Sequence, residues 1–298
     1  MNKVKIITDS CADLSGELLK KYDIDYAKMS TVEDGKESPA LLTWSSEDAH
    51  RLYETIRGGK RITTAQVSVE EFTSVFTKYL DAGYDIVYIG CSSKQSGSVN
   101  TANVIANKLC EKYTNSKIFC IDSLNASYGE GILAIEASKE AQNGKSAQEI
   151  NSHILKIRKT VQEFATVHTL DHLKKAGRVS ATSAFFGNLM GVKPILTADA
   201  KGNQSAYKKV KGRQTSIAEI VALLKENIVN PEEQTIYIGH ADCPLAEVEQ
   251  VEKLVRQEIP CKDVNIGYIG PIIGASVGPD AIGVWAFGKE VTFVSEAN

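Results

Sequence analysis

The chain has 298 residues, of which 43% are hydrophobic and 24% are charged, and its formal net charge is −3. This composition is typical of a soluble globular protein, and no apolar run approaches the roughly 20 residues that span a bilayer. The slight acidity argues against a protein that binds nucleic acid through its phosphate backbone. At about 150 residues per domain, the length predicts two domains.

In the first half, short apolar runs alternate with segments of helical period. Residues 4–7 predict an opening strand, and the early change to polar residues excludes a signal peptide, so we expect a cytoplasmic protein. A nearly continuous apolar run at 85–90 is typical of a strand in a buried parallel sheet. The other elements predicted here are helices at 15–22, 46–57, 69–80, 96–113, 127–143 and 147–160 and a strand at 117–121. This order predicts a parallel α/β sheet, whose ligands bind beyond the carboxyl ends of the strands.

The second half mixes strands with helices in a less regular order. Lys201-Gly202-Asn203, between two strand-like runs, indicates a hairpin. The predicted elements are strands at 164–168, 193–197, 206–211, 236–240, 264–269 and 282–287 and helices at 216–228 and 245–257. We therefore predict an α/β domain over 1–160 and an α+β domain over 161–290, with the ligand site in the cleft between them.

The cysteines and histidines give little indication of a metal site. The six cysteines are scattered without a CxxC pair, so we expect free thiols in a reducing cytosol. His168 and His172 stand four residues apart, but no cysteine or glutamate accompanies them at ligand spacing. We predict neither a metal nor a cofactor.

Four hydroxyl-rich segments are candidates for the site, at 8–10, 63–68, 91–98 and 122–127. The segment 91–98 lies between a predicted strand and a helix, where backbone N–H groups favour an anion. Hydroxyls of Ser96 and Thr64 could then bind a carboxylate or phosphate. Alternatively, Ser96 is only a helix N-cap. The segment matches neither a P-loop nor a GxSxG elbow, and His240 is either a general base brought near in space or an ordinary strand-end histidine.

Three further segments have both a structural and a functional interpretation. In 173–180, Gly177 is expected to end a helix and Ser180 to cap the next element, but capping does not explain Arg178. The basic stretch 208–213 is either a solvated strand face or a docking patch for an anionic partner or membrane. The glycine-rich stretch 270–283 is either a run of turns or a backbone that closely approaches a ligand.

Taken together, these segments resemble the DegV family of bacterial fatty-acid-binding proteins along nearly the whole chain. The matching motifs appear in the family's order. They are Thr8-Asp9-Ser10, Thr64-Ala65-Gln66-Val67-Ser68, Ser92-Ser93-Lys94-Gln95-Ser96-Gly97-Ser98, Asp122-Ser123 with Gly129 and Gly131, Lys175-Ala176-Gly177-Arg178-Val179-Ser180, Lys193-Pro194-Ile195-Leu196, and the segment that begins Gly270-Pro271.

The resemblance implies a two-domain lipid carrier with a long-chain fatty acid in a tunnel between the domains. The carrier would present the carboxylate to a separate ATP-dependent fatty acid kinase, which makes an acyl phosphate for phospholipid synthesis, and would not itself be an enzyme. Transient membrane contact is compatible with this role. The residues implied as ligand-binding are Thr64, Ser93, Ser96, Gly97, Ser127, Arg178 and Ser276. Arg178 and Arg213 would also serve partner docking.

The chain departs from the family pattern in its closing motif, which usually reads G-P-x-I-G-x-H-x-G-P-G. Ser276 stands at the histidine position and Asp280 at the last glycine position. Ala65 and Val67 likewise replace the usual serine and proline. Two alternatives therefore stay open: a hydrolase or transferase that uses Ser96 or Thr64 as nucleophile, although no base is evident, and a diverged member that binds a different small acid.

Overall fold

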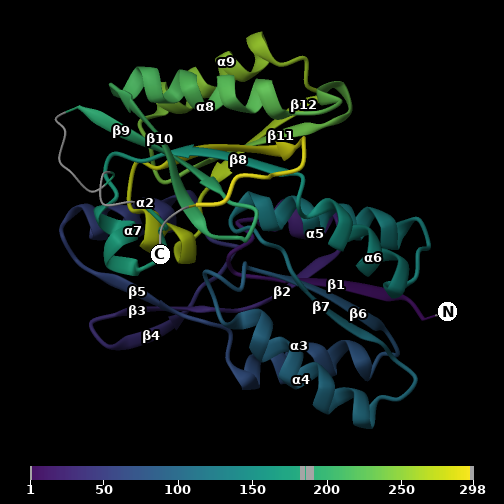
Figure 1. The fold of residues 1–298 in the computed structure, drawn as a ribbon. Coiled ribbons are helices and arrows are strands. Elements are labelled where there is room, and N and C mark those ends of the chain that lie inside the picture. The colour runs from purple at the N-terminus through teal and green to yellow at the C-terminus, as the bar shows by residue number, and fades with distance from the viewer. Residues whose placement is uncertain (1, 182–184, 186–190, 296–298) are drawn as a thin grey trace. The chain divides into compact units, whose positions relative to one another are not determined.

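The computed structural model describes residues 2–181, 185 and 191–295 and has a mixed α/β architecture (Figure 1). The chain forms two compact units. Unit 1 comprises Met1–Trp44 and Thr64–Lys159, and unit 2 comprises Ser45–Thr63 and Thr160–Asn298. Across the described residues, no helix is both long enough and apolar enough to span a membrane.

Unit 1 is built on a parallel sheet of strand order β2-β1-β6-β7. The strands are β1 (Val4–Asp9), β2 (Ile24–Ala27), β6 (Asp85–Gly90) and β7 (Ile118–Asp122). The helices α3 (Val69–Leu80) and α4 (Ser98–Lys112) pack on one face, and α5 (Tyr128–Gln142) and α6 (Ala147–Ile157) pack on the other (Figure 1). The prediction of a parallel-sheet α/β domain is confirmed.

Apolar burial explains why these elements form where they do. Phe72 and Phe76, one helical turn apart on α3, are fully buried and meet Tyr88 of β6, with the rings of Phe72 and Tyr88 5.1 Å apart between centroids. The Ser68 hydroxyl accepts a hydrogen bond from the Glu71 amide and thereby caps α3. Local pattern and long-range packing therefore agree in this part of unit 1.

Several short elements of unit 1 and of the junction are absent from the sequence-based description. They are the strands β2, β3 (Ser30–Glu33), β4 (Lys36–Pro39) and β5 (Ile62–Ala65). The helix α1 (Gly16–Lys21), by contrast, lies within the predicted range 15–22. The pair β3 and β4 forms an antiparallel hairpin in which all four β4 residues are exposed. Within β5 the chain returns from unit 2 to unit 1.

Unit 2 contains a mixed sheet of order β10-β9-β8-β13-β11-β12, in which only β11 and β12 are paired in parallel. The strands are β8 (Val161–Thr166), β9 (Val192–Ala198), β10 (Gln204–Lys211), β11 (Thr235–His240), β12 (Asp263–Tyr268) and β13 (Ile282–Phe287). The hairpin predicted at Gly202 joins β9 to β10, and Gly202 has a φ of 86°. The predicted α+β character is confirmed.

The helices of unit 2 are α2 (Ser46–Arg57), α7 (Asp171–Ala176), α8 (Arg213–Asn227), α9 (Leu245–Glu258) and α10 (Pro271–Val277), with a short 3₁₀ turn at Pro231–Glu233. The helices α8 and α9 cover one face of the sheet (Figure 1), and a continuous apolar core fills the space between them and the sheet. The helix α10 packs against both α2 and α7.

Two features of unit 2 differ from the sequence-based expectation. Residues 45–63, expected in the first domain, belong to unit 2, where the Tyr53 hydroxyl of α2 donates a 2.6 Å hydrogen bond to the Ile269 carbonyl. The glycine-rich stretch forms the helix α10 rather than a run of turns, because Pro271 at its first turn has a backbone already suited to a helix.

Candidate functional site

The carboxyl ends of β1, β6 and β7 bring three of the candidate segments to one edge of the unit 1 sheet. The backbone joins them directly: the Ser92 amide donates to the Asn125 carbonyl at 2.8 Å, and the Ser123 amide donates to the Gly90 carbonyl at 3.1 Å. This is the edge at which open α/β sheets bind ligands.

The N-terminus of α4 presents hydroxyls and open amides at this edge. The helix begins at Ser98 rather than at the predicted 96, and Ser96 is not its N-cap; Gly97 occupies that position, without a side-chain cap. The Ser96 hydroxyl lies 2.9 Å from that of Ser98, and it accepts a hydrogen bond from the Ser98 amide. Ser98 was not singled out in the sequence, although its fully buried hydroxyl accepts from the Val67 amide at 3.2 Å and so fixes the neighbouring segment.

The segment that contains Thr64 therefore lies beside the N-terminus of α4. The Gln66 side chain donates to the Thr101 hydroxyl at 2.9 Å and covers Gly97 so closely that a Cβ atom there would overlap it. Thr64 itself is half-buried in β5, and its hydroxyl makes no hydrogen bond to any of the described residues. Ser96, Gly97 and the 64–67 segment thus form one group, which is able to bind an anion through hydroxyl and amide donors.

Ser93 and Ser127 lie in the same strand-end loops but in different surroundings. Ser93 is exposed, and its amide donates to Asp122 Oδ1 at 3.3 Å. Ser127 is buried at a φ of 53°, and its hydroxyl donates to Asp13 Oδ2 at 2.6 Å. The Ser127 proton is therefore already used within the protein.

Two fully buried carboxyl groups lie below this edge. Asp9 accepts hydrogen bonds from the amides of Cys11 and Cys91 and from the Tyr88 hydroxyl, at 2.9, 3.2 and 2.7 Å. Glu130 accepts from the Thr8 hydroxyl at 2.6 Å. Burial raises the pKa of both carboxyl groups, because it disfavours the charged form.

The candidate residues of unit 2 lie around α7 and α10. Arg178 is exposed just beyond the αL residue Gly177 that ends α7, as predicted, and it donates to the Ala176 carbonyl at 2.7 Å. Ser276 is half-buried on α10. Just after α10, at a φ of 77°, Gly278 lies against His172, and a Cβ atom there would stand 2.5 Å from His172 Cδ2.

Asp280 and Arg213 belong to an ion-pair network within unit 2. Asp280 has a φ of 62° and pairs with Arg57 at 2.7 Å, and Arg57 also pairs with Asp242. Arg213 is 10% exposed, and it binds Glu247 at 2.8 Å and the Asp280 carbonyl at 2.6 Å. The charge of Asp280 is thus compensated by Arg57, and the guanidinium of Arg213 is largely buried inside unit 2, where its Nε and Nη2 atoms make these contacts.

Ser180, His168 and His240 make contacts that a purely structural role explains. Ser180 forms an isolated bridge with Ser205, and the residues that follow it, 182–184 and 186–190, lie outside the described chain. His240 stacks on Tyr268 with 4.5 Å between ring centroids, and burial lowers its pKa to about 4, so it is neutral near pH 7. His168 Nδ1 lies 3.1 Å from the Lys193 ammonium.

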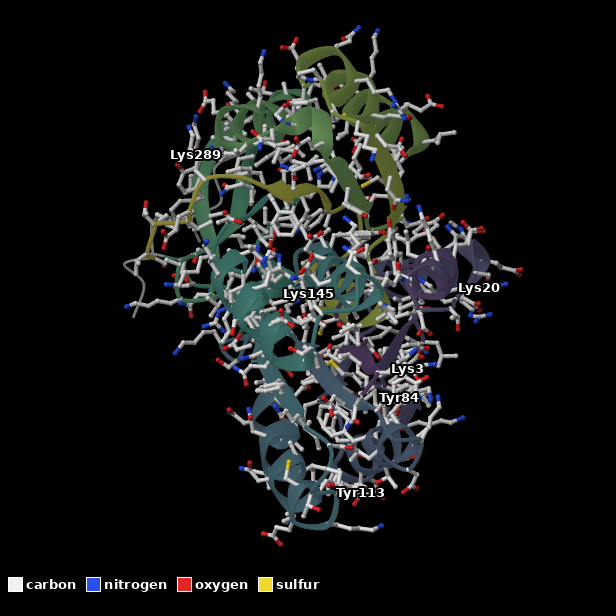
Figure 2. All side chains as sticks on the ribbon, turned by 90° about the vertical axis from the view of Figure 1, so that its right-hand side faces the viewer. Lys3, Lys20, Tyr84, Tyr113, Lys145 and Lys289 are labelled. Atoms are coloured by element: carbon white, nitrogen blue, oxygen red, sulfur yellow. The ribbon has the colours of Figure 1, made fainter. Side chains whose placement is uncertain are left out.

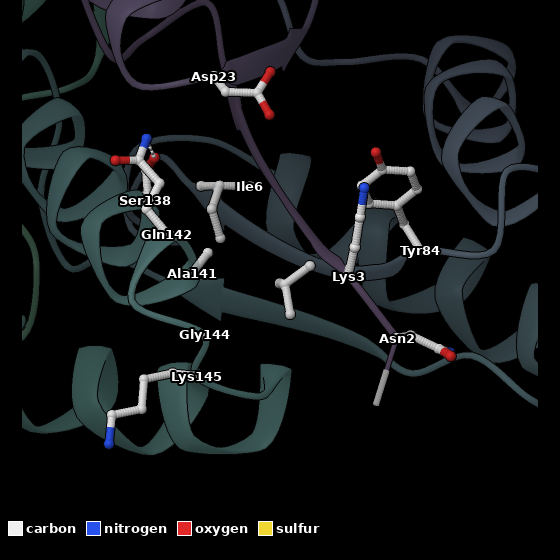
Figure 3. Close-up of a pocket in the computed structure, with 11 residues that line it drawn as sticks. Asn2, Lys3, Ile6, Asp23, Tyr84, Ser138, Ala141, Gln142, Gly144 and Lys145 are labelled. Carbon is white, nitrogen blue, oxygen red and sulfur yellow. Dashed lines mark hydrogen bonds between the residues drawn. The ribbon is translucent and has the colours of Figure 1, made fainter.

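A cavity of about 470 Å³ lies elsewhere in unit 1, at the amino end of β1. Figure 2 shows Lys3, Tyr84 and Lys145 on this side of unit 1, and Figure 3 shows how Lys3 and Asp23 line the cavity together with the end of α5. Its lining places charges of both signs, from Lys3, Asp23 and Lys145, beside apolar side chains, so it does not suit a long acyl chain. Because it lies beyond the opposite end of β1, it is separate from the hydroxyl-bearing loops.

The fold and these loops define a two-unit α/β protein that can bind an anionic group at strand-end hydroxyls. Comparison with known proteins identifies the family. Residues 3–289 match the family model described as "Uncharacterised protein, DegV family". A DegV domain-containing protein of Clostridium perfringens is 35% identical over 288 residues, which are 97% of this chain and 98% of that protein. The chain belongs to the DegV family.

Solved structures agree over the same length. A DegV lipid-binding protein of Thermotoga maritima has a TM-score of 0.83 and 29% identity, and the match covers 97% of this chain and all of that one. A second protein of that organism, described as revealing fatty acid binding function, has a TM-score of 0.83 and 27% identity over the same shares.

Proposed function

We propose that this protein binds a long-chain fatty acid and carries it, with the carboxylate held by the group around Ser96, Gly97 and Thr64. The observation that carries the proposal is the full-length likeness to two relatives, one described as lipid-binding and one as fatty-acid-binding. Two features of this chain's own residues support it: the Thr64 hydroxyl makes no hydrogen bond to any described residue, and the N-cap residue of α4 is Gly97, which has no side chain to cap the helix.

The energetics of such a ligand divide between its two ends. Each methylene removed from water contributes about 0.8 kcal/mol, so the acyl chain supplies most of the affinity. The carboxylate must keep its hydrogen bonds as it leaves water, and hydroxyls with helix N–H groups provide them. No acidic residue occupies the first turn of α4, so nothing in that turn repels an anion.

The first test is mass spectrometry of lipid released by denaturing the protein after purification from a bacterial host. We expect about one fatty acid per chain. Protein that releases no lipid and does not bind added fatty acids would refute fatty-acid binding and favour a different acid as ligand. Ser276 would then be the first residue to examine.

Variants then locate the carboxylate. Thr64→Ala and Ser96→Ala should each weaken fatty-acid binding by about 1–3 kcal/mol, roughly 5- to 150-fold in Kd, since each removes a partner of a buried charge. Ser152→Ala, which removes an exposed hydroxyl on α6, is the matched control. Wild-type affinity in both site variants, measured by titration calorimetry, would exclude this placement.

The handover of the ligand is a second part of the proposal. We infer that a separate kinase phosphorylates the presented carboxylate, and that this chain requires no cofactor of its own for the step. Loaded protein with ATP should yield acyl phosphate only when the kinase subunit is added. Arg178 is the exposed candidate for docking, so Arg178→Ala should lower that yield, whereas product from ATP without a kinase would refute the carrier role.

The alternative of a serine hydrolase receives no support from the contacts of Ser96. Its hydroxyl is engaged with the Ser98 hydroxyl and amide, and neither group can act as a base. Labelling of Ser96 by a fluorophosphonate probe would nevertheless favour the enzyme over the carrier, so the probe belongs beside the lipid measurement.

A further inference from the structure

A group of buried side chains beneath the strand-end loops takes no part in the proposed fatty-acid binding. Cys11, Cys91 and Glu130 each offer a donor atom, and these atoms all lie within 4.8 Å of one another. Cys11 and Cys91 are 1% exposed, and Glu130 is completely buried. Two thiols and a carboxyl group therefore converge in the interior of unit 1, where ionisable groups are rarely found without a partner.

The surrounding backbone holds this cluster in place. Cys11 follows β1 and Cys91 follows β6, and the carboxylate of Asp9 binds the amides of both cysteines. Asp9 therefore fixes the two cysteines around one point. Glu130, on the first turn of α5, is held through Oε1 by the Thr8 hydroxyl.

The second carboxyl oxygen of Glu130 provides independent evidence for a missing partner. Glu130 Oε2 is buried and has no hydrogen-bond partner among the described residues. A buried polar atom in this condition is costly and unusual in a native protein. Because its carboxyl group lies within the cluster of donor atoms, a ligand bound between the two sulfurs would also satisfy it.

The electrostatic surroundings favour a cation as that partner. The strongest charged or titratable neighbours of the cluster are themselves acids, namely Asp9, Asp13, Asp122 and Tyr88. Burial raises the pKa of the Glu130 carboxyl group, and the contact with Cys91 together with burial raises the pKa of the Cys11 thiol. A cation between these donor atoms would favour their charged forms.

We propose that Cys11, Cys91 and Glu130 bind one borderline-soft metal ion of the Zn²⁺ type. Zinc takes thiolate and carboxylate ligands together, whereas Cu⁺ prefers sulfur alone. Bonds of about 2.3 Å to sulfur and 2.0–2.2 Å to oxygen place two ligands of one ion no more than about 4.6 Å apart, so the donors need only small rotamer changes. Met29 Sδ, 3.4 Å from Cys11 Sγ, adds a further soft atom beside the site.

Binding exchanges protons for the metal. The thiol protons, and any proton that Glu130 carries, leave to solvent as the ion enters, so no electrons are transferred and the affinity rises with pH. Because the cluster is fully buried, the ion enters while unit 1 folds. It would join the loops after β1 and β6 to α5, and the site does not depend on which ligand the protein carries.

The test is refolding of the full chain. Protein unfolded in guanidinium with reductant and chelator is refolded, after the chelator is removed, with Zn²⁺ or Co²⁺ and then desalted. We expect one ion per chain by native mass spectrometry, a thiolate-to-cobalt absorption band and a higher Tm than metal-free protein. Cys11→Ser and Cys91→Ser should lose the ion, whereas Cys110→Ser, which changes an exposed thiol on α4 of the same unit, should keep it.

Three results would overturn the proposal. The first is wild-type protein that refolds without retaining an ion. The second is retention of the ion in both cysteine variants. The third is a mass lower by two hydrogens in the presence of reductant together with a peptide map that joins Cys11 to Cys91, which shows that these two thiols form a disulfide instead. If a cysteine variant does not refold, the cobalt band of the wild-type protein still decides whether thiolates bind the metal.

Discussion

Glu163 in the centre of the unit 2 sheet should make stability depend on pH in an unusual direction. Its carboxyl group is 5% exposed on β8, where Gln204 donates to it at 2.8 Å and Trp285 on β13 is its cross-strand neighbour. Burial outweighs this hydrogen bond and raises the pKa of Glu163 from 4.5 to about 7.

The sign and size of the effect follow from this shift. Between pH 4.5 and about 7 the unfolded chain has lost the Glu163 proton while the folded chain retains it. The free energy of unfolding therefore falls as the pH rises through this window and then stays level. The difference of 2.5 pH units, at about 1.4 kcal/mol per unit, gives about 3 kcal/mol in total.

Glu163→Gln isolates this contribution, because the amide has the same shape and no charge. The amide nitrogen of the variant cannot accept a hydrogen bond, which shifts its stability by a similar amount at every pH, so the informative quantity is the slope of stability against pH. We expect the free energy of unfolding of the variant, relative to wild type, to rise by about 2–3 kcal/mol between pH 5 and pH 8.5.

Urea denaturation followed by far-UV circular dichroism measures this difference without relying on Trp285 fluorescence, which the substitution itself perturbs. Glu249→Gln, an exposed position on α9, is the matched control. A difference between Glu163→Gln and wild type that stays constant from pH 5 to pH 8.5 would refute the reasoning.

Three substitutions test other contacts. Ser45→Ala removes the capping box of α2 and should cost about 1 kcal/mol in thermal denaturation, whereas an unchanged Tm would show that the cap is dispensable. Gly131→Ala places a Cβ atom 2.5 Å from the Ala12 carbonyl oxygen and should cost about 1–3 kcal/mol in urea denaturation, with wild-type stability as the contrary result. Asp280→Ala breaks the ion pair with Arg57 and places alanine at a φ of 62°, so it should lower the free energy of unfolding by about 1–2 kcal/mol. Asp280→Gly should recover the part of this loss that comes from the backbone conformation, because glycine tolerates a positive φ.

The elements that could be predicted are those whose side chains carry the pattern. The strands β6 and β13 begin and end where their apolar runs do, because both are buried on two faces. The strands β2, β3 and β4 have four residues each and no apolar run, and β4 is fully exposed. Backbone pairing defines β3 and β4, and only Ile24 and Ala27 of β2 are buried, so no sequence pattern shows these strands.

The candidate site divides in the same way. The loops at 8–10, 91–98 and 122–127 follow strands, so their meeting at one sheet edge could be predicted from the order of elements. The cluster of Cys11, Cys91 and Glu130 could not, because its members are far apart in sequence and belong to no motif. The compensation of Asp280 by Arg57 was hidden for a related reason, since α2 lies in the first half of the chain but packs in unit 2.

The excursion of residues 45–63 into unit 2 also sets an order for biosynthesis. The helix α2 leaves the ribosome early, but its partners are synthesised more than 200 residues later. They are α10 and the Ile269 carbonyl, which accepts the hydrogen bond of the Tyr53 hydroxyl. During that interval the buried face of α2, including Tyr53 and Ile56, has no covering surface. A nascent chain interrupted before residue 269 would therefore expose the apolar face of α2 near its N-terminal end. Chaperones or proteases could recognise the unfinished protein by this face.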